Sequence, residues 1–137
     1  MSTRGDRRSG AVAVLCAFLT TRSAQGQLGN GAASSVPTLP ADVSNLTDAT
    51  AVSGGYYSTC ALQSSGSVQC WGHDSSSSSS VPAAVSGLSG VTAIGSGNGF
   101  HCAVESDGTV WCWGDNSSGD LGNGTTDNSM TPVRVHL

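Results

Sequence analysis

The chain has 137 residues, a length that suits one small domain, and only 10% of them are charged. Beyond residue 24 a single basic residue, Arg134, stands against eight acidic ones, so this part of the chain carries a formal charge of −7. Such an acidic surface repels phosphate backbones and anionic lipid headgroups, which argues against nucleic-acid binding and against a role on a membrane surface.

The N-terminal stretch has the three parts of a secretory signal peptide. Arginines, among them Arg7 and Arg8, precede the nine apolar residues Ala11 to Leu19, and small and polar residues follow. Nine apolar residues are too few to cross a bilayer, which takes about 20. We expect residues 1–24 to be a signal peptide and the chain to be exported (periplasmic, cell-surface or extracellular), without stable membrane insertion. A buried element or a misassigned start codon is the alternative.

The rest of the chain, residues 25–137, is a tandem repeat. The stretch STCALQSSGSVQCWG (58–72) aligns with FHCAVESDGTVWCWG (100–114) at an offset of 42, and the same offset pairs Pro40 with Pro82. A coincidence of this many positions at one offset indicates repeated structural units rather than one irregular domain.

The copies differ in one segment. GQLGNG (26–31) resembles GDLGNG (119–124), and each precedes a proline, but the middle copy lacks this motif. Pro82 lies 10 positions after Gly72 in the middle copy and Pro132 lies 18 positions after Gly114 in the last, so the middle copy is shortened by eight residues. The shortening falls at 73–81, where we expect a serine run to form the loop.

Each copy has the composition of β-structure. Short segments rich in Val, Thr and Trp alternate with Gly and Ser clusters, and helical periodicity is absent outside the N-terminal stretch. Repeats of about 40–50 residues that contain several strands are typical of propeller blades. The expected strands are 49–53, 59–63, 67–71, 91–96, 101–105 and 109–113.

The cysteines predict disulfides. Cys16 lies in the segment that signal cleavage would remove, and the remaining even number suits an oxidised, exported chain. These remaining cysteines are Cys60, Cys70, Cys102 and Cys112.

Turn chemistry predicts how these cysteines pair. If Gly108 takes the left-handed position of a three-residue turn, the two cysteines of the last copy lie directly opposite each other in an antiparallel pair. Gly66 does the same in the middle copy. Opposed residues have Cα atoms about 4.5–5.5 Å apart, within reach of a disulfide. We therefore predict the bridges Cys60–Cys70 and Cys102–Cys112.

Catalytic and metal roles fit the sequence less well. No C-x-x-C pair of the kind that zinc sites use is present. His101 precedes Cys102, but neighbouring strand residues point to opposite faces, so these side chains diverge. The loop at 115–128 departs from the calcium-loop pattern. We expect no catalytic, metal or cofactor-binding residue.

Two tryptophans and three asparagines have more than one reading. Trp71 and Trp113 face away from the cysteines, and we expect them to pack between blades, with ligand stacking as the alternative. Potential N-glycosylation sites of the form N-x-[ST] start at the following residues, and they matter only in a eukaryotic secretory host: Asn45, Asn116 and Asn123.

The segment HCAVESDGTVWCWGDNSSGDLGNG, preceded by VSGLSGVTAIGSG and followed by TPVRV, resembles the regulator of chromosome condensation repeat. The resemblance covers about residues 26–137 and implies a β-propeller, typically of seven four-stranded blades; the cysteine-bearing version resembles exported bacterial members. About two repeats fit in this length. We therefore expect an all-β, incomplete propeller of roughly two blades with disulfide-stitched hairpins.

For function, we expect a non-catalytic exported module that binds an unidentified protein partner through its loops. Its chain is either a fragment of a larger propeller or one of several copies that complete a ring as a homo-oligomer. The resemblance implies a second role, guanine-nucleotide exchange on a small GTPase. A secreted enzyme inhibitor is a third possible role. It would need a full ring and aromatic loop residues, whereas the loops are serine-rich.

Overall fold

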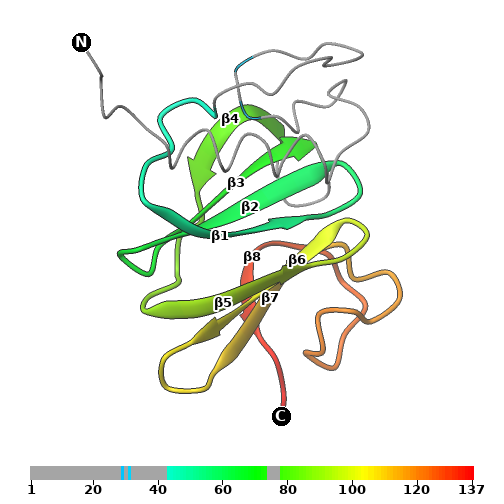
Figure 1. The fold of residues 1–137 in the computed structure, drawn as a ribbon. Helices are drawn as coiled ribbons and strands as arrows, with labels where there is room; N and C mark the ends of the chain where they lie inside the picture. Colours follow the sequence, from blue (N-terminus) through cyan, green and yellow to red (C-terminus); the bar gives the residue numbers. More distant parts are fainter. Residues whose placement is uncertain (1–28, 30, 32–42, 74–77) are drawn as a thin grey trace, which may run out of the picture.

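The computed structural model describes residues 29, 31, 43–73 and 78–137 of the chain. They form eight β-strands in two four-stranded antiparallel sheets (Figure 1). The predicted signal peptide, 1–24, lies outside the described residues. None of the described residues belongs to a helix long and apolar enough to cross a membrane. The strands are β1 (Ala49–Gly54), β2 (Ser58–Gln63), β3 (Val68–His73), β4 (Ser78–Ala84), β5 (Val91–Ser96), β6 (Phe100–Glu105), β7 (Val110–Gly114) and β8 (Ser129–Arg134).

The two sheets repeat one topology. Consecutive strands are neighbours, in the order β1-β2-β3-β4 and then β5-β6-β7-β8, and β5 packs against β1 and β2 (Figure 1). A twisted four-stranded meander stacked on its copy is the arrangement of propeller blades. The expected all-β fold of two blades is confirmed.

Both predicted disulfides are present, which confirms the disulfide-stitched hairpins. Cys60 lies opposite Cys70 and Cys102 opposite Cys112, with a Cα–Cα distance of 4.1 Å in each pair. The register around each pair agrees with the one that the turn chemistry predicts.

The turns that set this register contain a left-handed glycine. Gly66 has a φ of 83° and Gly108 a φ of 87°. The Gly108 N–H donates to the Glu105 carbonyl at 2.9 Å, and the Glu105 N–H donates to the Thr109 carbonyl at 2.9 Å. This is a tight turn followed by a bulge, and the left-handed position is one that glycine adopts without steric cost.

The fourth strand of each blade is the element that the sequence pattern does not single out. β4 begins at Ser78, inside the serine run expected to form a loop, so only residues 74–77 separate β3 from β4. Pro82 and Pro132 lie within β4 and β8. Proline removes a ladder donor, and it is tolerated here because β4 and β8 are the edge strands of their sheets.

The first blade is packed on both faces. On one face, Trp71 and Ala61 form a buried cluster with Val43 and Leu46. The other face carries the disulfide of the first blade and packs against the second blade. This second cluster consists of Cys60, Leu62, Val68, Cys70, Val91, Ala103 and Trp113. Because successive strand residues alternate between faces, Trp71 and the disulfide belong to different clusters.

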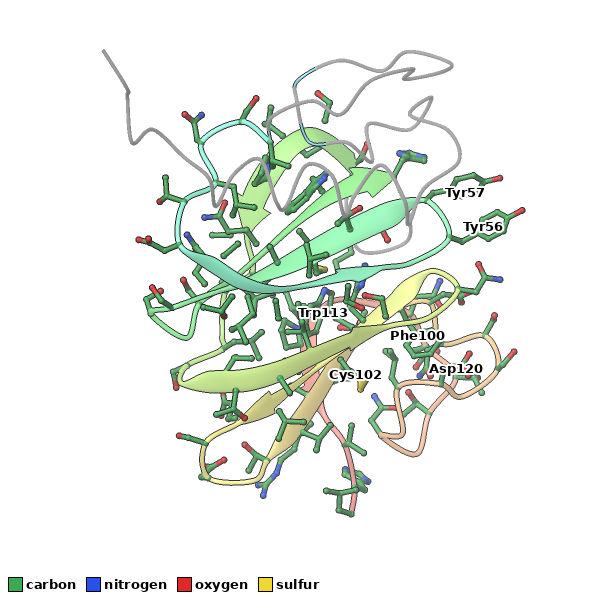
Figure 2. The ribbon with its side chains drawn as sticks, in the orientation of Figure 1. Tyr56, Tyr57, Phe100, Cys102, Trp113 and Asp120 are labelled. Atoms are coloured by element: carbon green, nitrogen blue, oxygen red, sulfur yellow. A yellow bond between two sulfur atoms is a disulfide. The ribbon has the colours of Figure 1, made fainter. Side chains whose placement is uncertain are left out.

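The tryptophans therefore have different surroundings. Trp113 extends from β7 onto the disulfide face of the first blade and lies between the two blades (Figure 2). Trp71, equally buried, packs in the cluster on the far face of the first blade. Each is a large apolar side chain whose removal would leave a cavity costing about 3–5 kcal/mol.

The far face of the second blade is less covered. Cys102, Val104 and Val110 are half-buried, whereas their counterparts in the first blade are buried. The difference follows from position, because the second blade has no successor among the described residues.

Candidate interaction surface

Every second connection between consecutive strands lies at the same end of the blades (Figure 1). In an antiparallel meander, every second connection returns to the same end. Among the described residues, the connections at one end are β1–β2, β5–β6 and β7–β8, with residues 55–57, 97–99 and 115–128. We call this surface the loop face.

The β1–β2 and β5–β6 hairpins close in the same way but present different side chains. The Gly55 N–H donates to the Ser58 carbonyl at 2.8 Å, as the Gly97 N–H does to the Phe100 carbonyl at 2.9 Å. Between these ends the first hairpin holds two tyrosines, where the second holds an asparagine and a glycine. The shared backbone thus displays different chemistry in the two blades.

Tyr56 and Tyr57 form an exposed aromatic pair. They are 65% and 44% exposed, and their rings meet edge to face with centroids 4.4 Å apart. Figure 2 shows both side chains pointing away from the sheets. Tyrosine supplies large apolar contact area together with a polar hydroxyl, and it is enriched among the residues that dominate protein–protein binding.

The long β7–β8 connection is organised around one buried residue, Asn116. Its Nδ2 donates to the carbonyls of Thr125 at 2.9 Å and Asp127 at 3.1 Å, and its Oδ1 accepts from the Leu121 N–H at 2.9 Å. The Asn116 N–H itself donates to Asn128 Oδ1 at 2.7 Å. One residue thereby ties together both ends of the connection.

The same connection carries the acidic charge of the loop face. Its carboxylates are Asp115, Asp120 and Asp127, and it contains neither lysine nor arginine. Ser117 donates its N–H to Asp115 Oδ1 at 2.9 Å, and hydrogen bonds from Ser117 hold the pKa of this carboxyl below its usual value of 3.8. The charge is therefore present at neutral pH.

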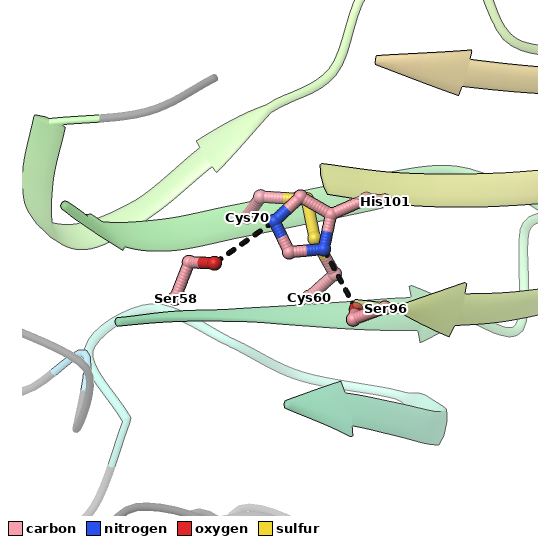
Figure 3. Close-up of a disulfide and its surroundings, with 5 residues drawn as sticks. All are labelled: Ser58, Cys60, Cys70, Ser96 and His101. Carbon is pink, nitrogen blue, oxygen red and sulfur yellow. Dashed lines mark hydrogen bonds between the residues drawn. A yellow bond between two sulfur atoms is a disulfide. The ribbon is translucent and has the colours of Figure 1, made fainter. Parts of the chain in front are cut away.

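His101 is a structural residue of the contact between blades. It is 1% exposed, its Nε2 lies 3.0 Å from Ser58 Oγ of the first blade, and its Nδ1 lies 2.7 Å from Ser96 Oγ (Figure 3). Cys102 points to the opposite face and is disulfide-bonded. Within the described part of the chain, no group of three or more metal-ligating side chains comes together.

Two features of the loop face are absent from the sequence-based predictions. The tyrosine pair lies in the segment SGGYYST, and it corrects the prediction that these loops are serine-rich and lack aromatic residues. Asn116 entered only as a glycosylation site, but its side chain is buried and bonded, so it is not accessible to a glycan in the folded chain. The signal that could have found it is its place two residues after the repeated Trp-Gly pair.

Comparison with known proteins identifies the repeat. Sequence profiles described as "Regulator of chromosome condensation (RCC1) repeat" match residues 49–77, 91–120 and 107–137. The chain belongs to this family. By sequence, no curated protein matches it at a significant level.

Solved structures share the RCC1-repeat fold. Human WBSCR16 matches with a TM-score of 0.75 and 24% identity, over 85% of this chain and 34% of that one. A chain in the crystal structure of Kap60 bound to yeast RCC1 (Prp20) matches with a TM-score of 0.77 and 15% identity, over 85% and 32%. Prp20p from Saccharomyces cerevisiae matches with a TM-score of 0.66 and 17% identity, over 84% and 33%. The RCC1-repeat chain thus spans about a third of their length.

We predict that Asn116→Ala destabilises this RCC1-repeat chain by about 2–4 kcal/mol, because it leaves a buried N–H and two carbonyls without their partner. Asn98→Ala, at an exposed position of the same face, is the matched control and should change stability by less than about 0.5 kcal/mol. Urea unfolding measures both. Equal midpoints for the two variants would show that Asn116 does not organise the loop.

Proposed function

We propose that this RCC1-repeat chain is a non-catalytic, exported module that binds a protein partner through the loop face. The observation that carries the proposal is the exposed Tyr56–Tyr57 pair, set on a hairpin anchored by the blade core. An aromatic pair on a fixed backbone loses little conformational entropy on binding, so its buried area contributes to affinity.

The charge of the loop face supports a protein partner rather than a nucleic acid. The three carboxylates of 115–128 stand without a neighbouring cation in that connection. Such a surface repels phosphate and attracts basic side chains or backbone N–H groups. A partner with a basic patch beside an apolar one fits the loop face best.

Relatives of the same fold give a precedent for protein binding. Yeast RCC1 (Prp20) is bound to Kap60 in one structure, and the structure of Prp20p was described with its binding properties to Gsp1p and histones. These partners belong to those proteins. For this chain they support the class of function only, and the exchange-factor role stays a prediction from resemblance.

Enzyme inhibition is a second candidate, because the tyrosine pair supplies the aromatic loop residues that this role needs. An inhibitor would insert such a pair into an enzyme's binding cleft, which is one form of protein binding through the same surface. The two candidates differ in the partner and not in the site.

Export is supported by the cysteine chemistry. Both disulfides close hairpins within the fold, and disulfides persist in extracytoplasmic compartments, whereas the cytosol keeps thiols reduced. The signal-like stretch at 1–24 is the second support.

The far face of the second blade is less covered than that of the first. We propose that further blades, from a longer chain or from other copies, pack on this face.

Site-specific photo-crosslinking tests the loop face. A photoreactive amino acid replaces Tyr56 or Asp120 on the loop face, or Ser65 or Asp107 at exposed turns of the opposite end, in the chain expressed in its source cells. We expect a discrete protein adduct from the first pair only. The same adduct from both ends, or from neither, would contradict binding through this face.

Once the crosslinked protein is purified, Tyr56→Ala/Tyr57→Ala should weaken its binding at least tenfold, since about 1.4 kcal/mol corresponds to a factor of ten. Ser65→Ala/Asp107→Ala is the control and should leave affinity unchanged.

Cell fractionation with mass spectrometry tests export. We predict that the chain recovered outside the cytoplasm lacks residues 1–24, and that its remaining cysteines resist alkylation until a reductant is added. A full-length chain confined to the cytoplasm, with its four hairpin thiols alkylated directly, would overturn the proposal of export.

A further inference from the structure

A groove opens between the outer edges of the two blades, beside Trp113. It has a volume of about 110 Å³ and is lined in part by Val85, Ser86 and Met130. This volume is well above the roughly 10–15 Å³ that a cavity needs to hold one water molecule. The groove borders the edge strands β4 and β8 and is separate from the loop face.

The equivalent position in the first blade is occupied by the chain itself. Gly29 lies so close to Trp71 that a Cβ added to it would come within 2.6 Å of the indole Nε1 and 2.9 Å of Val43 Cγ1. Gly29 also has a φ of 68°. Only glycine fits at this point, both because of the contact and because of the left-handed backbone.

Two backbone hydrogen bonds hold this segment on the first blade. The Ser44 N–H donates to the Gly29 carbonyl at 2.8 Å, and the Gly31 N–H donates to the Ser80 carbonyl at 2.9 Å. The segment therefore bridges the stretch that precedes β1 and the edge strand β4.

The repeat places the lining of the groove at the same positions. At the offset of 42, Trp71 corresponds to Trp113, Val43 to Val85 and Ser44 to Ser86. At the offset of 50 that relates the two prolines of the edge strands, Ser80 corresponds to Met130. All four counterparts line the groove, which is thus the second blade's version of the seat that Gly29 and Gly31 occupy.

The sequence explains why none of the described residues occupies this groove as Gly29 and Gly31 occupy its counterpart. In the middle copy the stretch from the Trp-Gly pair to the proline of the edge strand is eight residues shorter than in the last copy, and the Gly-x-Leu-Gly-x-Gly motif that would reach Trp113 is missing. Where the motif recurs, at 119–124, the valine contact and the backbone hydrogen bond recur too. The His136 N–H donates to the Gly122 carbonyl at 2.9 Å, and a Cβ on Gly122 would come within 3.0 Å of Val135 Cγ1.

We propose that this groove binds a glycine-rich segment of a partner polypeptide, of the form Gly-x-Leu-Gly-x-Gly, with its second glycine on the Trp113 indole. The Ser86 N–H donates to that glycine's carbonyl, and the Met130 carbonyl accepts an N–H from the residue two positions on. This inference is independent of the loop face and concerns a second surface with its own ligand.

The probe is a peptide with the sequence of residues 24–34, added to the oxidised full-length chain while the tryptophan indole N–H resonances are followed by NMR. We expect a saturable shift of the Trp113 resonance. A peptide carrying Gly29→Ala is the matched control. Its affinity should be lower by at least about tenfold, because its added Cβ meets the indole.

A protein variant checks the hydrogen bond without altering the peptide. Ser86→Pro removes the donor and should abolish the Trp113 shift, while the remaining indole resonances stay in place and show that the fold is kept. No shift at millimolar peptide, equal shifts from both peptides, or a shift confined to Trp71 would each overturn the proposal.

Discussion

The contact between the two blades is the constraint on which the rest of the structure depends. A single four-stranded sheet has two faces, and in the first blade both carry large apolar groups. One face is closed by the second blade, which brings Trp113 into the buried cluster that contains Cys60 and Cys70. The same contact places His101 against Ser58 (Figure 3). A polar bond inside an apolar contact fixes the position of one blade on the other, because a slipped arrangement would bury unpaired groups.

Local features of this fold were predictable and contacts between repeats were not. Gly108 fixes a turn, the turn fixes the register, and the register brings Cys102 opposite Cys112; every step spans about ten residues. The bond between His101 and Ser58 joins residues 43 apart in the sequence, and no periodicity connects them. The burial of His101 depends on the neighbouring blade, so it could be predicted only once the packing of the two blades was known.

The loop face shows the same division. Its backbone follows from repetition, since equivalent hairpins close with equivalent hydrogen bonds. What differs between copies, the pair Tyr56–Tyr57 and the missing glycine motif, carries the functional proposals. In a repeat protein, the positions common to all copies build the core, so a departure from the repeat is where a specific binding surface can arise.

A double-mutant cycle across the blades tests the central claim most directly. The free energies of unfolding of Ser58→Ala, His101→Ala and the double variant are compared with that of the unchanged chain. If the bond couples the blades, the double variant loses less stability than the two single variants together, by about 0.5–3 kcal/mol. Additive losses, within about 0.5 kcal/mol, would contradict the account and show that the blades are stacked without being interlocked.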